Sequence, residues 1–386
     1  MIYLFPLSPY NQQRQFEKPV WVYPAHLAMY ATYLKNKGHE VIWGWDKEAV
    51  IRACAEKQIE KIKKMSQAGL YPHLTTMFGK ETLNGMVKDL YGKPNTQIIE
   101  NDYQIDVPFE KLPYPDRVFT DAKNPRWQAY GNYRKHPATH MMVSNLCWYG
   151  KCTFCVDTKK LQEGEKRGVR TVDHVMEEID DLIRQGYKEV FDDSGTFPVG
   201  DWLTEFCMKM RINNRRNKIR LGCNMKPVNI DYKMMADAGF RFILVGLESA
   251  NQFTLDKIQK GQNAEKQIET IKKMSQAGLY PHLTTMFGYE FETEKDAQNT
   301  LDMVHYLLRK GYAKTCQASV YSKPRTRPDP NSYGHKYIPM VYDVLHYPEF
   351  WYHKVRDIKD FDDVKYLIRG ARLVVEEKWR KFASSC

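Results

Sequence analysis

The sequence predicts an α/β protein whose main part is a partial (β/α)6 TIM-like barrel. Three observations predict this fold. Six apolar strand patterns alternate with helix patterns between residues 139 and 320, a separate strand–helix–strand pattern occupies residues 2–46, and residues 323–386 carry aromatic helix patterns. Strict alternation of strands and helices is typical of a parallel sheet with right-handed crossovers. The expected order is a truncated flavodoxin-like (Rossmann-like) domain, the partial barrel, and a C-terminal helical extension.

The N-terminal domain is expected over residues 1–110. Residues 2–6 have a strand pattern, residues 24–38 have a helix pattern that ends at Gly38, and residues 39–45 have a second strand pattern. A doubly wound α/β domain opens with these three elements.

A duplicated segment follows them. Residues 55–81 recur at 264–290 with differences only at positions 61/270 and 80/289. A repeat array needs three or more related units, so two near-identical copies indicate either a recent duplication or an error of sequence assembly. The family resemblance given below implies a helix, a strand and a turn where copy 264–290 stands, and segment 55–81 is therefore interpreted as the intruding copy.

The barrel is expected over residues 137–322, after an irregular connector at 111–136. Its length is well short of the roughly 250 residues of a closed eight-fold barrel, which favours an open one. The strands are predicted at residues 139–147, 187–194, 219–225, 240–249, 279–288 and 313–321. The helices between them are predicted at residues 171–186, 201–214, 230–239, 264–278 and 294–311. Residues 323–386 are expected to add two or three helices.

Composition excludes several classes of protein. Lys and Arg exceed Asp and Glu by 11, but the excess lies in short runs such as Arg215-Arg216, which solvated helix faces explain better than a nucleic-acid site. No run of 18 apolar residues predicts a membrane span, and the first residues resemble a strand more than a signal peptide. Five of the eight cysteines are isolated in sequence, so a disulfide scaffold is not expected and a cytoplasmic location is.

The other three cysteines lie within nine residues, in the stretch "CWYGKCTFC". Cys147 falls at the carboxyl end of the first barrel strand, where parallel α/β units place their functional residues. A structural zinc site needs four ligands, and a disulfide would leave one thiol over. Three thiolates on a 4Fe-4S cluster leave one iron open to bind the amino and carboxylate groups of S-adenosylmethionine (SAM). Zinc binding and unligated thiols remain alternatives.

This stretch resembles the signature of the radical SAM superfamily, in which an aromatic residue precedes the last of three cysteines. The matching residues are Cys147, Cys152, Phe154 and Cys155, with four residues between the first two cysteines where the family usually has three. The resemblance implies a 4Fe-4S cluster held by the three cysteines, SAM as cofactor, and release of a 5′-deoxyadenosyl radical.

Three later strand ends extend the resemblance. The family binds the SAM amino group after the second strand, the ribose or methionine part after the fourth, and the adenine near a turn after the fifth. By this resemblance the SAM contacts are expected at Asp192, Asp193, Ser194, Gly246, Glu248, Ser249 and Gly288. Helix capping is the simpler explanation for Glu292 and Thr293.

The first 46 residues, above all 22–46, resemble the start of the cobalamin-binding domain that precedes many radical SAM enzymes. The Asp-x-His-x-x-Gly motif of some cobalamin proteins is absent from the sequence. The resemblance implies radical chemistry or cobalamin-dependent methyl transfer on a small-molecule or natural-product substrate, with flavodoxin or ferredoxin as electron donor. Neither a membrane nor nucleic acid is an expected partner. The alternatives are a zinc-stabilised nucleic-acid-binding module and a catalytically inactive relative.

Overall fold

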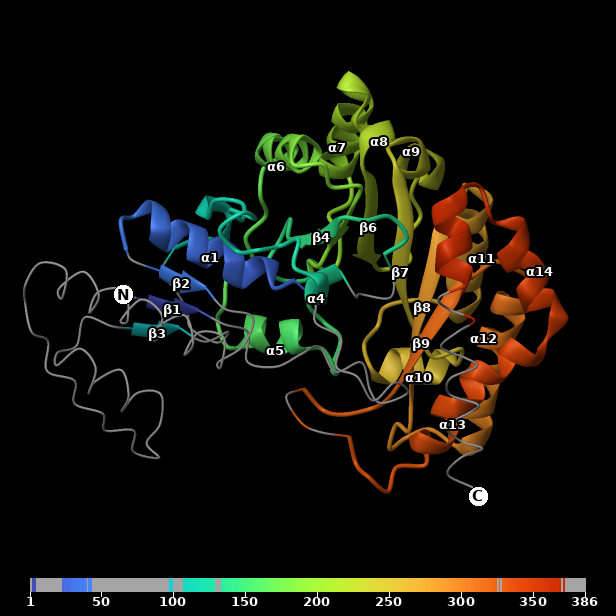
Figure 1. The fold of residues 1–386 in the computed structure, drawn as a ribbon. Coiled ribbons are helices and arrows are strands. Elements are labelled where there is room, and N and C mark those ends of the chain that lie inside the picture. The colour runs from blue at the N-terminus through green and yellow to red at the C-terminus, as the bar shows by residue number, and fades with distance from the viewer. Residues whose placement is uncertain are drawn as a thin grey trace, which may run out of the picture. The chain divides into compact units, whose positions relative to one another are not determined.

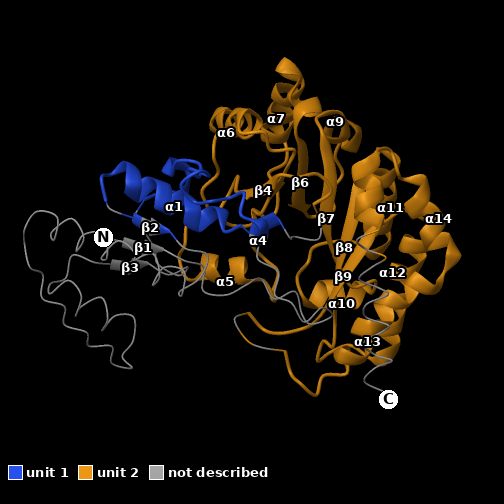
Figure 2. Cartoon of the chain, viewed as in Figure 1, with its two compact units in different colours: residues 1–129 blue, residues 130–386 orange. Residues whose placement is uncertain are grey.

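The chain divides into two compact units, residues 1–129 and residues 130–386 (Figure 2). The structure, a computed structural model, describes residues 2–4, 23–39, 41–43, 97–99, 107–128, 133–324, 326, 328–368 and 371. The duplicated segment 55–81 lies outside the described residues, so the prediction for it stays a prediction.

The first unit contains a small parallel sheet in the order β2-β1-β3. Its described elements are β1 (Ile2–Leu4), α1 (Ala25–Asn36), β2 (Val41–Trp43), β3 (Gln97–Ile99), η1 (Phe109–Lys111) and α4 (Pro125–Gln128). Helix α1 buries Leu27, Ala31 and Leu34 against Val41. Gly38 follows the helix at φ +84°, a conformation that glycine adopts without strain.

The expected connector, residues 111–136, is divided between the two units. Leu112, Ala122 and Trp127 are buried. Asp116 accepts a hydrogen bond from Lys35 Nζ at 2.7 Å, and its backbone N–H donates to Thr32 Oγ1 at 2.8 Å. Residues 107–128 therefore pack with the helix α1 as part of the first unit.

The second unit is built on a six-stranded parallel sheet in the order β4-β5-β6-β7-β8-β9, with the intervening helices alongside it (Figure 1). This is the predicted partial (β/α)6 barrel. Its strands are β4 (Ala138–Met141), β5 (Glu189–Asp192), β6 (Arg220–Met225), β7 (Phe240–Glu248), β8 (Tyr280–Phe287) and β9 (Thr315–Val320). The predicted helices appear as α6 (Val172–Arg184), α7 (Asp201–Arg211), α9 (Tyr232–Asp237), α11 (Ala264–Gln276) and α12 (Glu294–Arg309).

The second copy of the duplicated segment is an integral part of this barrel. It forms α11 and β8, where a helix and a strand were predicted, and both Leu283 and Thr285 are buried. Asn263 caps α11 by accepting a hydrogen bond from the backbone N–H of Lys266. The capping residue lies outside the duplicated sequence, so the barrel copy obtains its helix start from its own flank.

Strand β4 is shorter than predicted. The sequence predicted a strand over 139–147, but β4 ends at Met141 because the chain turns away and Val143 and Ser144 bond to side chains from the end of β5. The sequence also predicted no helix at α5 (Val156–Gln162), α8 (Arg215–Lys218) or α10 (Gln252–Lys257), and the end of the helix predicted over 201–214 forms the 3₁₀ turn η2 (Ile212–Asn214). The C-terminal extension contains α13 (Gly334–Met340), η3 (Val341–His346) and α14 (Pro348–Arg356).

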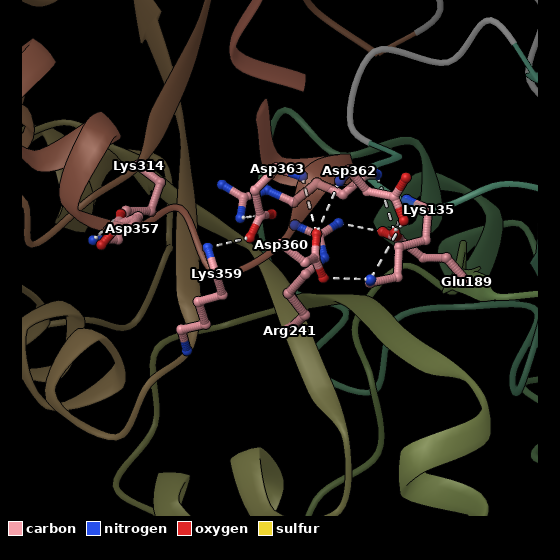
Figure 3. A network of polar contacts seen from close by, with 10 residues as sticks. Lys135, Glu189, Arg241, Lys314, Asp357, Lys359, Asp360, Asp362 and Asp363 are labelled. Carbon is pink, nitrogen blue, oxygen red and sulfur yellow. Dashed lines mark hydrogen bonds and ion pairs between the residues drawn. The ribbon is translucent and has the colours of Figure 1, made fainter. Parts of the chain in front are cut away.

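The amino edge of the barrel sheet carries a network of ion pairs (Figure 3). Glu189, the first residue of β5, pairs with Arg241 of β7, and Lys135 pairs with Asp360 at 2.6 Å. Arg134 pairs with Asp363 at 2.7 Å. The C-terminal extension thus attaches to the amino ends of the strands. No helix in the described part of the chain is long and apolar enough to span a membrane.

Candidate active site at the carboxyl edge of the barrel

The three clustered cysteines lie on a loop between β4 and α5. All three are half-buried and free of disulfides. The Cys155 N–H donates to the Cys152 carbonyl at 3.1 Å, and the Cys147 N–H donates to Asp157 Oδ2 at 2.8 Å. The first turn of α5 thereby holds both ends of the loop.

The surroundings of the loop disfavour the thiolate form of the cysteines when no metal is bound to them. Burial, together with the negative charges of Cys155, Glu248 and Cys147, raises the pKa of Cys152 to about 11 against the opposing effect of Lys260. Burial also raises the pKa of Cys155. A metal centre removes these protons on binding, because it stabilises the thiolate directly. Among the residues that the structure describes, no three His, Cys, Asp or Glu side chains are grouped closely enough to hold one metal ion.

Gly195 lets the end of β5 lie directly against the cysteine loop. A Cβ on Gly195 would lie 2.1 Å from Asp157 Oδ2, which would have to move, and 3.0 Å from the Cys147 Cβ, which is a tight contact. Gly195 and Asp157 were both missed from the sequence. The sequence feature that could have indicated Gly195 is its place directly after "FDDS", at the end of a predicted strand next to the strand that leads to Cys147.

The three polar residues at the end of β5 have different surroundings. Asp192 Oδ1 accepts hydrogen bonds from Val143 N at 2.8 Å and from Ser194 Oγ at 2.9 Å. Ser194 Oγ also accepts from Ser144 N at 2.9 Å. Asp192 and Ser194 are completely buried, so they hold the chain segment that leads to Cys147.

Asp193 differs from its two neighbours. Its side chain is exposed and makes no hydrogen bond to a described residue, although its backbone N–H donates to the Met141 carbonyl at 2.9 Å. Desolvation by the surrounding protein and the charge of Asp157 nevertheless raise its pKa. Of the three residues, Asp193 is the one whose carboxylate is available to a ligand.

Glu248, at the end of β7, has strained backbone geometry and a buried ion pair. Its φ is +60°, and the β7–β8 register shifts between Gly246 and Glu248. A non-glycine residue in this region costs about 1–3 kcal/mol and marks functional sites more often than ordinary turns. Glu248 pairs with Lys260 at 2.7 Å, and a Cβ on Gly246 would lie 2.5 Å from each of the two paired atoms.

Lys260 was also missed from the sequence, because it lies in the turn after α10 and matches no motif. Its Nζ lies 5.7 Å from the centre of the Phe154 ring. Burial would lower its pKa, but the charges of Glu248 and Cys152 outweigh burial and raise it. Lys260 therefore connects the end of β7 electrostatically to the cysteine loop.

Hydrogen bonds attach the cysteine loop to the segment that carries Lys260. Thr153 N donates to the Ile258 carbonyl, and Tyr149 Oη donates to the Gln259 carbonyl, both at 3.0 Å. Lys226, just past β6, places its Nζ 3.0 Å from the centre of the Tyr149 ring. Burial and nearby cations lower the pKa of Lys226 to about 8, against the opposing charge of Cys152.

Ser249 does not share the surroundings of Glu248. It is completely buried, and its hydroxyl bonds to Glu292 Oε1 at 3.0 Å and lies 3.2 Å from Thr300 Oγ1. These bonds connect the end of β7 to α12. Thr293 is the cap of α12, in a capping box with Asp296, so the predicted capping role belongs to Thr293 and not to Glu292.

Gly288 makes room for the C-terminal extension. Its φ is +89°, and a Cβ there would lie 2.2 Å from Ser332 Oγ and 3.1 Å from the Gly334 Cα. Beside it is an aromatic cluster, in which Leu255, Ile258 and Tyr289 are buried and Phe154, Met286, Phe291 and Tyr321 pack against them. Phe154 therefore joins the cysteine loop to the turn where an adenine was expected.

Comparison with known proteins agrees with this geometry. The family model of the radical SAM superfamily matches residues 141–304. The chain is 24% identical over 261 residues to an uncharacterized methyltransferase of Pyrococcus horikoshii, and 24% identical over 197 residues to the anaerobic magnesium-protoporphyrin IX monomethyl ester cyclase of Cereibacter sphaeroides. These matches cover 63% and 47% of this chain, and 49% and 31% of the relatives. The chain thus spans less than half the length of these relatives.

Solved structures share the fold. The cobalamin-dependent SAM radical enzyme OxsB, with aqua-cobalamin and SAM bound, superposes with a TM-score of 0.53 at 16% identity, over 90% of this chain and 55% of that one. The radical SAM methyltransferase TsrM from Kitasatospora setae, with tryptophan and a SAM analogue bound, has a TM-score of 0.51 at 17% identity, over 82% of this chain and 72% of that one.

Proposed function

Residues 141–304 are a radical SAM domain, and from this premise we propose that the chain is an enzyme that cleaves SAM reductively at a 4Fe-4S cluster held by Cys147, Cys152 and Cys155. The observation that carries the proposal is the meeting of these thiols with the Glu248–Lys260 pair at one edge of the sheet. When bound, the cluster supplies one electron, which breaks a carbon–sulfur bond of SAM and leaves a radical that abstracts hydrogen from substrate.

The donor set of this chain fits such a cluster. Three thiols without disulfide partners lie on a loop that hydrogen bonds hold at both ends. Lys260 and Lys226 lie near enough to act on Cys152, and they offset part of the negative charge that three thiolates would bring together. Protein cations beside bound thiolates lower the cost of placing such a charge in a desolvated site.

The remaining polar groups fit the polar parts of SAM. Asp193 offers a carboxylate for the amino group, and Lys260 offers a cation for the carboxylate. Glu248 is held by Lys260 in a strained conformation from which it accepts hydrogen bonds from ribose hydroxyls. Asp192, Ser194, Ser249 and Gly288 act as positioning residues, since their atoms are used within the protein.

We also propose that cobalamin binds to the N-terminal unit and that methyl transfer to a small molecule or natural product is the outcome. The parallel sheet β2-β1-β3 is consistent with a doubly wound domain. Of the two similar structures, OxsB is a cobalamin-dependent enzyme and TsrM is a methyltransferase. Flavodoxin or ferredoxin is the proposed electron donor, and the cytoplasm the proposed location.

Anaerobic reconstitution with iron and sulfide, followed by addition of SAM and a reductant, tests the proposal. We expect a four-iron cluster and formation of 5′-deoxyadenosine. Added cobalamin should bind, and S-adenosylhomocysteine should form if methyl transfer is the outcome. Protein that takes up zinc, holds no iron and binds nucleic acid would instead be the zinc-stabilised module. Protein that holds the cluster but never cleaves SAM would be an inactive relative.

A further inference from the structure

The amino edge of the barrel sheet contains a cavity of about 450 Å³. Lys135 precedes β4, Lys188 precedes β5, and residues 217–220 lead into β6, so the lining comes from three neighbouring strand starts. A volume of about 300–1,000 Å³ is usual for a site that takes a small molecule. Because the candidate active site lies at the opposite ends of the same strands, the cavity is separate from it.

The side chains around the cavity make it positive. None of the eight lining residues is acidic, and four are cationic: Lys135, Lys188, Lys218 and Arg220. Lys135 already pairs with Asp360 of the C-terminal extension (Figure 3). The other three cations are exposed and form no ion pair within the described part of the chain. Their charge is therefore available to an anion from solution.

Cations close by in the sequence are paired instead. Arg215, in the same short helix as Lys218, pairs with Asp180 at 2.6 Å. Lys209 of α7 pairs with Asp173 at 2.6 Å. The three unpaired cations of the cavity differ from these ordinary surface charges, because like charges gathered in one place repel each other until an anion binds between them.

Backbone hydrogen bonds hold the cationic segments in fixed positions. The N–H of Lys188 donates to the Pro137 carbonyl at 2.8 Å, and the N–H of Arg220 donates to the Lys188 carbonyl at 2.9 Å. Tyr187 and Ile219, both buried, give the cavity a largely apolar wall. A site built on a fixed backbone loses little conformational entropy when a ligand binds.

We propose that this cavity binds a small anion with two or more linked phosphate groups, held by Lys188, Lys218 and Arg220. Phosphate oxygens accept charge-assisted hydrogen bonds from lysine and arginine, and a single phosphate would engage only part of this set of cations. Inorganic polyphosphate and nucleotides share this chemistry, and the apolar wall favours a nucleotide. The inference does not depend on the proposed function, because no residue of the cavity belongs to the candidate active site.

Isothermal titration calorimetry of the reconstituted protein tests the proposal, with ATP and tripolyphosphate as probes. SAM is present in excess and no reductant is added, so that the probes do not enter the proposed SAM site. We expect both probes to bind, ATP more tightly, and we expect added NaCl to weaken both because it screens exposed charges. Binding of tripolyphosphate alone would identify an inorganic anion as the ligand, and binding of ATP alone a nucleotide. Wild-type protein that binds neither probe would overturn the inference.

Substitutions in the cavity locate the binding. Lys188→Gln and Arg220→Gln should each weaken the binding of the probes about tenfold, since each removes one charge-assisted hydrogen bond. Lys188→Arg keeps the charge and should retain most of the affinity. Both side chains are exposed, so the Tm without a probe should not change.

Lys295→Gln is the matched control, because it removes the charge of one exposed lysine on α12, outside the cavity. It should leave the affinity for the probes unchanged. If Lys188→Gln and Arg220→Gln bind the probes as tightly as the wild type, the anion binds elsewhere and the inference is wrong. An equal loss of affinity in Lys295→Gln would overturn it as well, since only the net charge of the protein would then matter.

Discussion

The two edges of the barrel sheet treat polar side chains in opposite ways. At the amino edge, Glu189 of β5 pairs with Arg241 of β7, and Glu189 Oε2 also accepts hydrogen bonds from the backbone N–H groups of Arg134 and Lys135 (Figure 3). Arg134 in turn pairs with Asp363 of the C-terminal extension. The buried charges there are paired with opposite charges of the protein.

At the carboxyl edge, the same strands lead into residues with strained backbone or with polar groups that lack partners among the described residues. Strand β5 leads into Asp193, whose carboxylate bonds to no described residue, and β7 ends in Glu248 at φ +60°. The Tyr289 hydroxyl after β8 has no hydrogen-bond partner among the described residues, and Lys226 after β6, whose pKa is lowered, lies over an aromatic ring. Unfavourable local features of this kind persist where the rest of the fold is stable enough to hold them.

The amino edge thus stabilises the barrel, and the carboxyl edge carries the polar groups that we propose bind SAM. Parallel barrels place their active sites at the carboxyl ends of the strands, and stability at the opposite face. Substitutions at the two edges should therefore separate into effects on SAM binding and effects on unfolding.

The largest expected effect is at the cysteine loop. Cys147→Ala, Cys152→Ala or Cys155→Ala should each abolish retention of a four-iron cluster and SAM cleavage, because a cluster with two protein ligands is held too weakly. The measurement is iron and sulfide content together with 5′-deoxyadenosine formation.

Cys207→Ala is the control for this set, since Cys207 is buried on α7. It should keep its iron even if it lowers the Tm. A full iron content in any of the three loop variants would remove that cysteine from the ligand set.

The next effect is on stability at the amino edge. Glu189→Ala leaves Arg241 buried without its charge partner, which costs about 3–5 kcal/mol of unfolding free energy. Urea denaturation measures this cost, and SAM affinity of the reconstituted variant should remain that of the wild type. Asp237→Asn, which breaks an exposed pair with Lys233, should change neither quantity. A loss of SAM affinity in Glu189→Ala would show that the two edges are coupled.

Two substitutions of Glu248 test backbone strain and SAM binding together. Glu248→Ala and Glu248→Gly both remove the partner of Lys260 and should weaken SAM binding about tenfold, equivalent to about 1.4 kcal/mol. Glycine tolerates φ +60° and alanine does not, so Glu248→Gly should be the more stable of the two by about 1 kcal/mol.

Calorimetric titration with SAM and urea denaturation of SAM-free protein measure the two effects. If Glu248→Ala is as stable as Glu248→Gly, the backbone at Glu248 is not strained. If both bind SAM normally, Glu248 has no part in binding.

A further expected effect is a pH dependence of stability at Asp192. Burial raises its pKa to about 7, against about 3.9 in an unfolded chain. Between these values the folded protein holds a proton that the unfolded chain has lost, so the contribution of Asp192 to stability is complete below about pH 4 and is lost as the pH rises through about 7. The unfolding free energy of Asp192→Asn relative to wild type should therefore rise between pH 4 and pH 7 and level off above.

Asp180→Asn is the control for this measurement. The hydrogen bonds from Arg215 lower the pKa of Asp180, so its contribution changes only below about pH 4. The difference between Asp180→Asn and wild type should stay constant from pH 4 to pH 7. A constant difference for Asp192→Asn as well would show that Asp192 is ionised across this range.

Much of the fold could be predicted from the periodicity of apolar residues, because the helices and strands of the barrel have their own capping residues and apolar patterns in the sequence. Helix α6 begins at Thr171, which accepts a hydrogen bond from His174 N as the cap, and β7 is an apolar run that is buried along nearly its whole length. The error at β4 has the opposite cause. Residues 142–147 have strand propensity, but Asp192 and Ser194 from the next strand capture their backbone N–H groups.

Only the part of the site whose residues lie within one short stretch of sequence could be predicted. The spacing of Cys147, Cys152 and Cys155 by itself determined a candidate cluster loop at a strand end, and alternation determined the parallel sheet that places it. Only the tertiary structure decided that Lys260 pairs with Glu248, that Ser249 bonds to Glu292 instead, and that the Tyr289 hydroxyl has no described partner. The physical reason is that hydrogen bonds and ion pairs join groups by distance in space, whereas periodicity and motif spacing report distance along the chain.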